Sequence, residues 1–131
     1  MDGELGADED GPATRVVDVL VVDDDESARS SFAEVLRSAG LSVGEAGDGI
    51  EGLAYLMEVT ARTIVLDVRM PNLDGPHFLD HLDDPPPVVL VTGAFYDDEV
   101  MARGSKVTWF LKKPVSPEEL VTIVMRCLRR C

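Results

Sequence analysis

Polar side chains occur at the points where four short apolar runs of the sequence end. They are the carboxylates of Asp23, Asp24 and Asp67, the hydroxyl of Thr92 and the ammonium group of Lys113. Three carboxylates in one crevice would repel one another and have raised pKa values unless a cation joined them. Mg²⁺ binds to one or two carboxylates and completes its shell with water and phosphate oxygens. We therefore expect a Mg²⁺ site in which Asp67, the central carboxylate, is the candidate nucleophile for an acyl phosphate.

The elements that would position these groups alternate between strand and helix. Apolar runs of strand length lie at 16–22, 41–46, 63–66, 88–91 and 107–111. Helical spacing of apolar residues is found at 28–39, 50–58 and 97–103, in a short segment through Phe78 and Leu82, and after Ser116. Such apolar strands are typical of a parallel sheet buried on both faces. Five βα units predict a doubly wound parallel sheet, which binds ligands outside the carboxyl ends of its strands.

Residue types also predict where helices begin and which faces they bury. Ser27 is expected to cap the first helix, and Ser116 to cap the last one in a capping box with Glu119. In the second helix, Leu53, Leu56 and Met57 are expected to face the core.

Composition and charge exclude several classes of protein. The chain has 131 residues and a formal net charge of −13, a field that repels nucleic-acid phosphates and anionic lipid. No apolar run approaches the roughly 20 residues of a membrane span. Residues 1–14 predict a disordered acidic tail before a folded domain at 15–131. Cys127 and Cys131 are four residues apart, so we expect two reduced thiols in a cytoplasmic protein.

Four stretches of this sequence resemble the receiver domain of two-component response regulators. They are VLVVDDDE at 19–26, IVLDVRMPNLDG at 64–75, LVTG at 90–93 and FLKKP at 110–114. Each motif alone is weak, whereas their order and spacing together are highly specific. The resemblance implies a flavodoxin-like (βα)5 fold with strand order 2-1-3-4-5, and a signalling domain whose only catalysis is its own phosphoryl transfer and slow self-hydrolysis.

The resemblance also implies an acceptor and a metal site. Asp67 would accept a phosphoryl group from the phosphohistidine of a sensor histidine kinase or a phosphotransfer protein. Asp23, Asp24, Asp67 and the backbone carbonyl of Arg69 would hold Mg²⁺. The cofactor expected from the family is thus the one that the carboxylates themselves favour.

A switch is the third implication of the resemblance. Lys113 would pair with the phosphoryl oxygens, Thr92 would swing toward them, and Phe110 would follow it inward. The bond before Pro114 would be cis. The surface around the fourth helix, fifth strand and fifth helix would then change for a downstream protein partner, and the resemblance allows a homodimer as well.

Two other functions stay open at this point. Asp23-x-Asp25-x-Ser27 resembles the nucleophile motif of haloacid-dehalogenase phosphatases, although the further acidic pair and the cap that those enzymes need are missing. A pseudo-receiver would keep the fold as a binding module without phosphorylation. The intact set of site residues argues against this second reading, while the irregular segment at 101–108 keeps it open.

Four further residues allow two interpretations each. Lys112 competes with Lys113 for the phosphate role, but the proline that follows favours Lys113. His77 and His81 have a spacing that can bind zinc, but no third ligand is evident, so a surface pair is expected. Trp109 is either part of the core on an edge strand or, if exposed, the mark of a partner surface.

Overall fold

The computed structural model describes residues 15–93 and 98–129. They contain one parallel sheet of five strands in the order β2-β1-β3-β4-β5, as the sequence predicts. The strands are β1 (Arg15–Val22), β2 (Val43–Ala46), β3 (Val59–Asp67), β4 (Val88–Thr92) and β5 (Trp109–Lys112). The tail expected at 1–14 lies outside the described residues.

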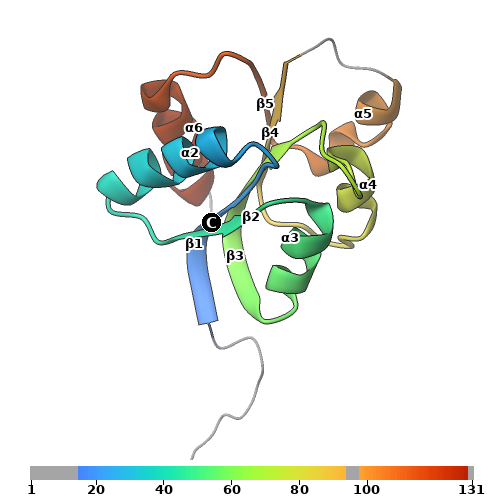
Figure 1. The fold of residues 1–131 in the computed structure, drawn as a ribbon, viewed down its shortest axis with the longest axis horizontal. Coiled ribbons are helices and arrows are strands. Elements are labelled where there is room, and N and C mark those ends of the chain that lie inside the picture. The colour runs from blue at the N-terminus through green and yellow to red at the C-terminus, as the bar shows by residue number, and fades with distance from the viewer. Residues whose placement is uncertain (1–14, 94–97, 130–131) are drawn as a thin grey trace, which may run out of the picture.

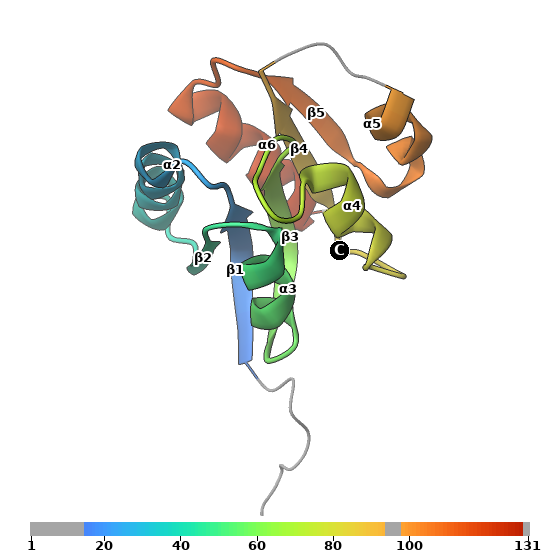
Figure 2. The same cartoon turned by 45° about the vertical axis from the view of Figure 1, so that its right-hand side comes forward.

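Helices cover both faces of the sheet, which makes the fold doubly wound (Figures 1 and 2). One face carries α2 (Glu26–Ser38) and α6 (Pro117–Arg129). The other carries α3 (Gly49–Leu56), α4 (Gly75–Asp80) and α5 (Asp98–Ala102), and a short 3-10 turn, η1 (Gly104–Lys106), follows α5. Among the described helices, none has the length and apolar character needed to cross a membrane.

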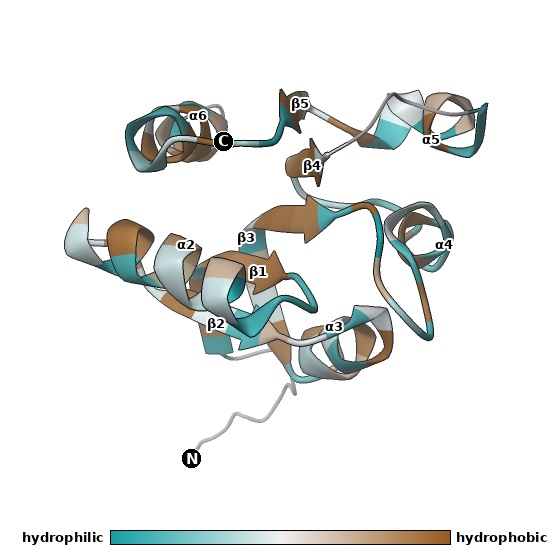
Figure 3. Ribbon diagram, turned by 45° about the horizontal axis from the view of Figure 1, so that its top comes forward, coloured by the Kyte–Doolittle hydropathy of each residue, from teal (hydrophilic) through white to brown (hydrophobic). Residues whose placement is uncertain are grey.

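The apolar strands hold the two helical layers together. Val19, Leu20, Val21 and Val22 of β1 are all 0% exposed, because alternate side chains enter the cores on opposite faces of the sheet. Figure 3 shows the hydrophobic strands between the two groups of helices. A central strand buried in this way fixes the position of the residue that follows it, Asp23.

Two local predictions at helix ends are wrong. Asp25, not Ser27, caps α2: its Oδ1 accepts the backbone N–H groups of Ser27 and Ala28 at 3.0 and 3.3 Å. Both residue types are good caps, and the helix starts early enough to use the aspartate. Met57 is 80% exposed, because α3 ends at Leu56 and the helical period no longer directs Met57 to the core. The predicted cap of α6 is confirmed, with Ser116 Oγ accepting the Glu119 N–H at 3.0 Å.

Several element boundaries also differ from those predicted. β3 begins at Val59 instead of 63, because buried Val59 and Ala61 alternate with exposed Thr60 and Arg62. The helix predicted at 97–103 is present as α5, while its expected first residue, 97, lies outside the described residues. The chain continues after α5 as η1, which begins at Gly104, a residue of low helix propensity.

Candidate functional site

The carboxyl ends of the strands meet at one edge of the sheet and bring the predicted site residues together. Asp23 directly follows β1, while Asp67 and Thr92 are the last residues of β3 and β4. Lys113 directly follows β5, and its backbone N–H donates to the Thr92 carbonyl at 2.7 Å. The strand-end placement predicted from the sequence is therefore confirmed.

Three carboxylates form a compact cluster at this edge. One carboxylate oxygen from each of Asp23, Asp24 and Asp67 lies within 4.8 Å of the other two. Asp23 and Asp67 are 2% and 5% exposed, whereas Asp24 is exposed. The third member is thus Asp24, and Asp25 serves as the α2 cap.

Lys113 supplies the positive charge beside this cluster. Its Nζ lies 3.0 Å from Asp67 Oδ1, and its side chain is partly exposed. Lys112, the alternative in the sequence, is exposed on β5. The structure therefore selects Lys113 as the partner of Asp67.

Burial and neighbouring charges shift the pKa values of Asp23, Asp67 and Lys113. Burial raises the pKa of Asp67, although the hydrogen bond from Lys113 opposes this, and the nearby Asp23 raises it further. Burial likewise raises the pKa of Asp23. Partial burial disfavours the ammonium form of Lys113, but the hydrogen bond and attraction of Asp67 outweigh it and raise the Lys113 pKa. Three carboxylates thus face a single ammonium group, and a further cation beside them would favour their ionised forms.

The residues present fit a hard divalent cation. Asp23 Oδ1 accepts the Asp25 backbone N–H at 2.9 Å, but Asp23 Oδ2 is buried and has no hydrogen-bond partner within the described parts of the chain. An unsatisfied carboxylate oxygen is costly unless a proton or a cation meets it. The cluster borders a hollow of about 480 Å³, which Asp25, Arg69, Gly93 and Lys113 also line. Mg²⁺ prefers such an all-oxygen set with room for water.

The loop between β3 and α4 is held close to Asp67. Gly75 N–H donates to the Val68 carbonyl at 2.8 Å, and a Cβ at position 75 would lie 2.7 Å from the Asp67 carbonyl oxygen. Only glycine permits this approach. Asn72 has a left-handed φ of 70° and donates from Nδ2 to Asp48 Oδ2 at 2.9 Å, which fastens the loop to the start of α3.

Comparison with known proteins agrees with this geometry. The family model described as the response regulator receiver domain matches residues 19–125. The chain belongs to this family. It is 39% identical over 116 residues to the transcriptional regulatory protein PrrA of Mycobacterium leprae, covering 86% of this chain and 50% of the relative. It is 36% identical over 118 residues to the response regulator MprA of Mycobacterium tuberculosis, covering 87% and 51%. The chain thus spans about half the length of these relatives.

Solved receiver structures have the same fold. The receiver domain of the Francisella response regulator 1452 aligns with a TM-score of 0.79 at 28% identity, covering 87% of this chain and 98% of that one. The chemotaxis protein CheY4 of Vibrio cholerae aligns with a TM-score of 0.75 at 30% identity, covering 88% and 100%. The chain is a receiver domain of two-component signal transduction, and the phosphatase interpretation of Asp23-x-Asp25-x-Ser27 is wrong.

Other predicted residues of the receiver lie farther from the hollow. Thr92 is 2% exposed at the end of β4 and is not among the residues that line the hollow. Phe110 is half-buried and packs against the core under α3 and α4, whereas its neighbour Trp109 packs against the core under α2 and α6. Trp109 is thus a half-buried residue of an edge strand. The Lys113-Pro114 bond is cis.

Sequence reasoning missed one residue next to the carboxylates. Arg29 of α2 donates from Nη1 to the Asp23 carbonyl at 2.8 Å, and its Nε lies 3.4 Å from Glu45 Oε1. It joins the loop after β1 to the strand β2. The sequence shows Arg29 shortly after the acidic motif. It does not show the path of the loop after β1, which brings the Asp23 carbonyl within reach of Arg29.

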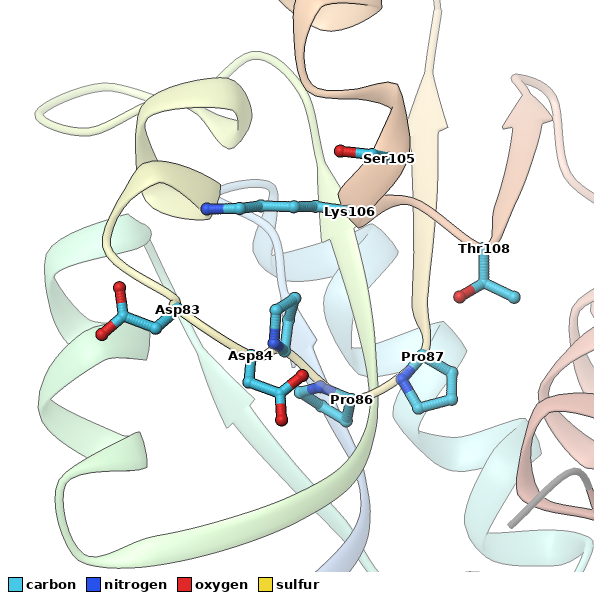
Figure 4. Close-up of a pocket in the computed structure, with 8 residues that line it drawn as sticks. Asp83, Asp84, Pro86, Pro87, Ser105, Lys106 and Thr108 are labelled. Carbon is cyan, nitrogen blue, oxygen red and sulfur yellow. The ribbon is translucent and has the colours of Figure 1, made fainter.

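A separate hollow of about 550 Å³ lies at the other end of β4 and β5, away from the carboxylates. Asp83, Asp84 and the prolines before β4 line it (Figure 4). Lys106 also lines it, and its side chain donates from Nζ to the carbonyl of Leu79 in α4 at 3.0 Å and to that of Leu82, just after α4, at 2.8 Å. None of the predicted site residues lines this hollow.

Two minor predictions concern the histidine pair and the two cysteines. His77 and His81 are both exposed, and His81 Nδ1 lies 3.0 Å from the His77 carbonyl rather than beside its ring nitrogens. Cys127 is a buried thiol of α6, while Cys131 lies outside the described residues.

Proposed function

We propose that Asp67 is the phosphoacceptor of this receiver domain and that Mg²⁺ is held by Asp23, Asp24 and Asp67, with the backbone carbonyl of Arg69. The observation that carries the proposal is the unpartnered, buried Oδ2 of Asp23 beside the Lys113–Asp67 ion pair. A bound Mg²⁺ would satisfy this oxygen, offset the carboxylate charge and act as a Lewis acid toward phosphoryl oxygens.

The transfer itself needs a nucleophile and a leaving group. An oxygen of the Asp67 carboxylate attacks the phosphorus of a phosphohistidine, and a P–O bond forms as the P–N bond breaks. The imidazole leaves with the electron pair of that bond and takes up a proton. The donor is a sensor histidine kinase or a phosphotransfer protein, since these supply such a phosphohistidine.

Lys113 and Thr92 respond to the new charge. Lys113 exchanges its contact with Asp67 Oδ1 for one with a phosphoryl oxygen, a charge-assisted bond. Thr92 turns its hydroxyl to another phosphoryl oxygen, and Phe110 moves inward behind it. A change from 1:99 to 99:1 between two states needs about 5.5 kcal/mol, which a few such bonds can supply.

The consequence is a changed surface for a downstream protein. This surface lies over α5, β5 and α6, next to the segments that carry Thr92 and Phe110. The net charge of −13 favours a protein partner over nucleic acid for this segment. The name of the M. leprae relative refers to transcription, but that protein is about twice as long as the matched region.

Intact mass spectrometry tests the proposal. The chain is incubated with Mg²⁺ and acetyl phosphate, beside the variants Asp67→Asn and Asp25→Asn. We expect one phosphoryl adduct on the native chain and on Asp25→Asn, where asparagine keeps the cap of α2. The adduct should be absent from Asp67→Asn and after chelation of Mg²⁺.

An adduct that survives in Asp67→Asn would overturn the acceptor assignment. If the native chain shows no adduct, binding of the phosphoryl mimic beryllofluoride is measured next by calorimetry. Failure of both would favour the pseudo-receiver, a domain that keeps the fold and serves as a binding module.

A further inference from the structure

A second cluster of metal-ligating side chains lies outside the proposed Mg²⁺ site. It consists of Asp74, the residue that caps α4, together with His77 of α4 and Glu99 of α5. One possible ligand atom from each residue lies within 4.8 Å of the other two. The sequence shows Asp74 and His77 as near neighbours, but Glu99 reaches them only through the fold.

We propose that Asp74, His77 and Glu99 form a second metal site that binds a transition-metal ion of the Zn²⁺ type and joins α4 to α5. The ligand set decides the type of ion. Imidazole nitrogen with two carboxylates suits Zn²⁺, which takes four ligands, whereas Mg²⁺ prefers oxygen alone. Three protein ligands leave one position for water or for a group from a partner.

Contacts within α4 hold the first two ligands in place. The Asp74 carboxylate accepts the His77 backbone N–H at 2.9 Å and also faces His77 Nδ1 at 2.7 Å. The imidazole and the carboxylate are therefore already oriented toward each other. Both side chains are partly exposed, so small rotations can open the distance of about 3.3 Å that two ligands on one tetrahedral Zn²⁺ need.

Arg103 holds the third ligand, which comes from a different helix. Its guanidinium contacts Asp80 of α4 at 2.9 and 2.7 Å and donates to the Glu99 carbonyl of α5 at 2.8 Å. This bridge keeps the start of α5 beside α4. The Asp80 carboxylate also compensates the Arg103 charge, so two acids remain to attract a cation to His77.

Space for the ion is present beside the cluster. A hollow of about 230 Å³ is bordered by Asp74 and Glu99, with Arg69 and Met70 from the β3–α4 loop. Arg69 borders the hollow of the first site as well. An ion held here would restrain α5 relative to α4, next to the loop that approaches Asp67. The site does not depend on phosphoryl transfer.

Calorimetric titration with Zn²⁺ tests the inference on the full chain, kept reduced and saturated with Mg²⁺. We expect one equivalent of Zn²⁺ to bind, and the affinity to fall at least tenfold in His77→Ala and in Glu99→Gln. The matched control is His81→Ala, which removes an exposed histidine of the same segment and should leave the affinity unchanged. Co²⁺ absorption should show a nitrogen–oxygen site without thiolate bands.

Several outcomes would overturn the inference. They are the absence of Zn²⁺ binding, an equal loss in His81→Ala, and binding that persists in His77→Ala but disappears in Cys131→Ser or Asp67→Asn. The last result would place the ion on the terminal thiols or in the first carboxylate cluster. Because His77 is exposed, its replacement is expected to leave the fold intact, and Glu99→Gln provides a second variant.

Discussion

The two clusters of ligating side chains are positioned in different ways. Asp23 and Asp67 stand at the ends of central strands whose residues are buried on both faces, and their side chains are almost inaccessible to solvent. His77 and Glu99 are exposed on two short helices, which the side chain of Arg103 joins. The first arrangement belongs to the core, whereas the second depends on surface contacts.

This difference indicates that the two clusters have different roles. Rigid strands bury the carboxylates of Asp23 and Asp67, and these charges destabilise the folded protein unless a cation or a proton neutralises them. Such a pair is suited to binding a cation and to a chemical reaction. The distances within a cluster carried on short helices change when the helices move. Such a cluster is suited to controlling the surface that these helices form. The first prediction below compares the two regions directly, and each of the others tests the contacts of one of them.

The largest expected effect concerns Mg²⁺ binding. Asp23→Asn removes the charge of the buried ligand, and we expect the Mg²⁺ affinity to fall about 100-fold, equivalent to about 2.7 kcal/mol. Asp74→Asn makes the same change in the second cluster and should alter the Mg²⁺ affinity less than about twofold, within experimental scatter. Calorimetric titration with Mg²⁺ measures both. Equal losses in the two variants would contradict the separation of the sites.

The second effect concerns the contacts that hold α4. Lys106→Met leaves the carbonyls of Leu79 and Leu82 without their charged donor, and we expect a loss of about 2 kcal/mol in the free energy of unfolding. Urea unfolding measures this loss. Arg126→Met, at an exposed position near the end of α6, is the control and should change stability by less than about 0.5 kcal/mol. If both variants unfold at the same urea concentration, Lys106 does not hold α4.

The third effect is a gain of stability in the metal-free protein. Because burial raises the pKa of Asp23, the folded state binds its proton more strongly than the unfolded chain does. The associated stability is present below the ordinary carboxyl pKa and is lost as pH rises through the raised pKa. Asp23→Asn should therefore be more stable than the native chain at pH 7 without Mg²⁺, by on the order of 1 kcal/mol.

Thermal unfolding in a chelator, followed at several pH values, measures this gain. The advantage of the variant should disappear at a pH below the ordinary carboxyl pKa, where the aspartate is also neutral. A variant that is less stable than the native chain at pH 7 would show that the buried Asp23 carboxylate does not destabilise the folded protein.

The smallest effect concerns Arg29. Its hydrogen bond reaches the backbone carbonyl of Asp23 and not a ligating oxygen, so Arg29→Gln should weaken Mg²⁺ binding by less than about tenfold. Arg29→Lys, which keeps a positive charge, should lie between the native chain and Arg29→Gln. Calorimetry again gives the affinities. A loss as large as that of Asp23→Asn would make Arg29 an essential part of the site.

The first region could be predicted from the sequence because its signals are local. A continuous apolar run ending in Asp23 marks a buried parallel strand, and the same pattern precedes Asp67. Strand ends in a parallel sheet share one edge, so the convergence of these residues follows from their position alone. The role of Asp25 needed the structure, because both Asp25 and Ser27 are residue types that can cap a helix.

The second region could not be predicted because its contacts join distant residues. His77 and Glu99 are far apart in the chain, and Arg103 contacts Asp80 only when α5 lies beside α4.

The exposure of Met57 has a more local cause, the early end of α3. A helical period predicts the buried face only as far as the helix continues.

Direct mapping of the modified residue tests the central claim. After reaction with acetyl phosphate and Mg²⁺, borohydride reduces an aspartyl phosphate to homoserine, and peptide mass spectrometry then locates the altered residue. We predict homoserine at position 67 alone, with none when Mg²⁺ is chelated before the reaction. Homoserine at position 23 or 24, with position 67 unchanged, would contradict the assignment of Asp67 as the acceptor.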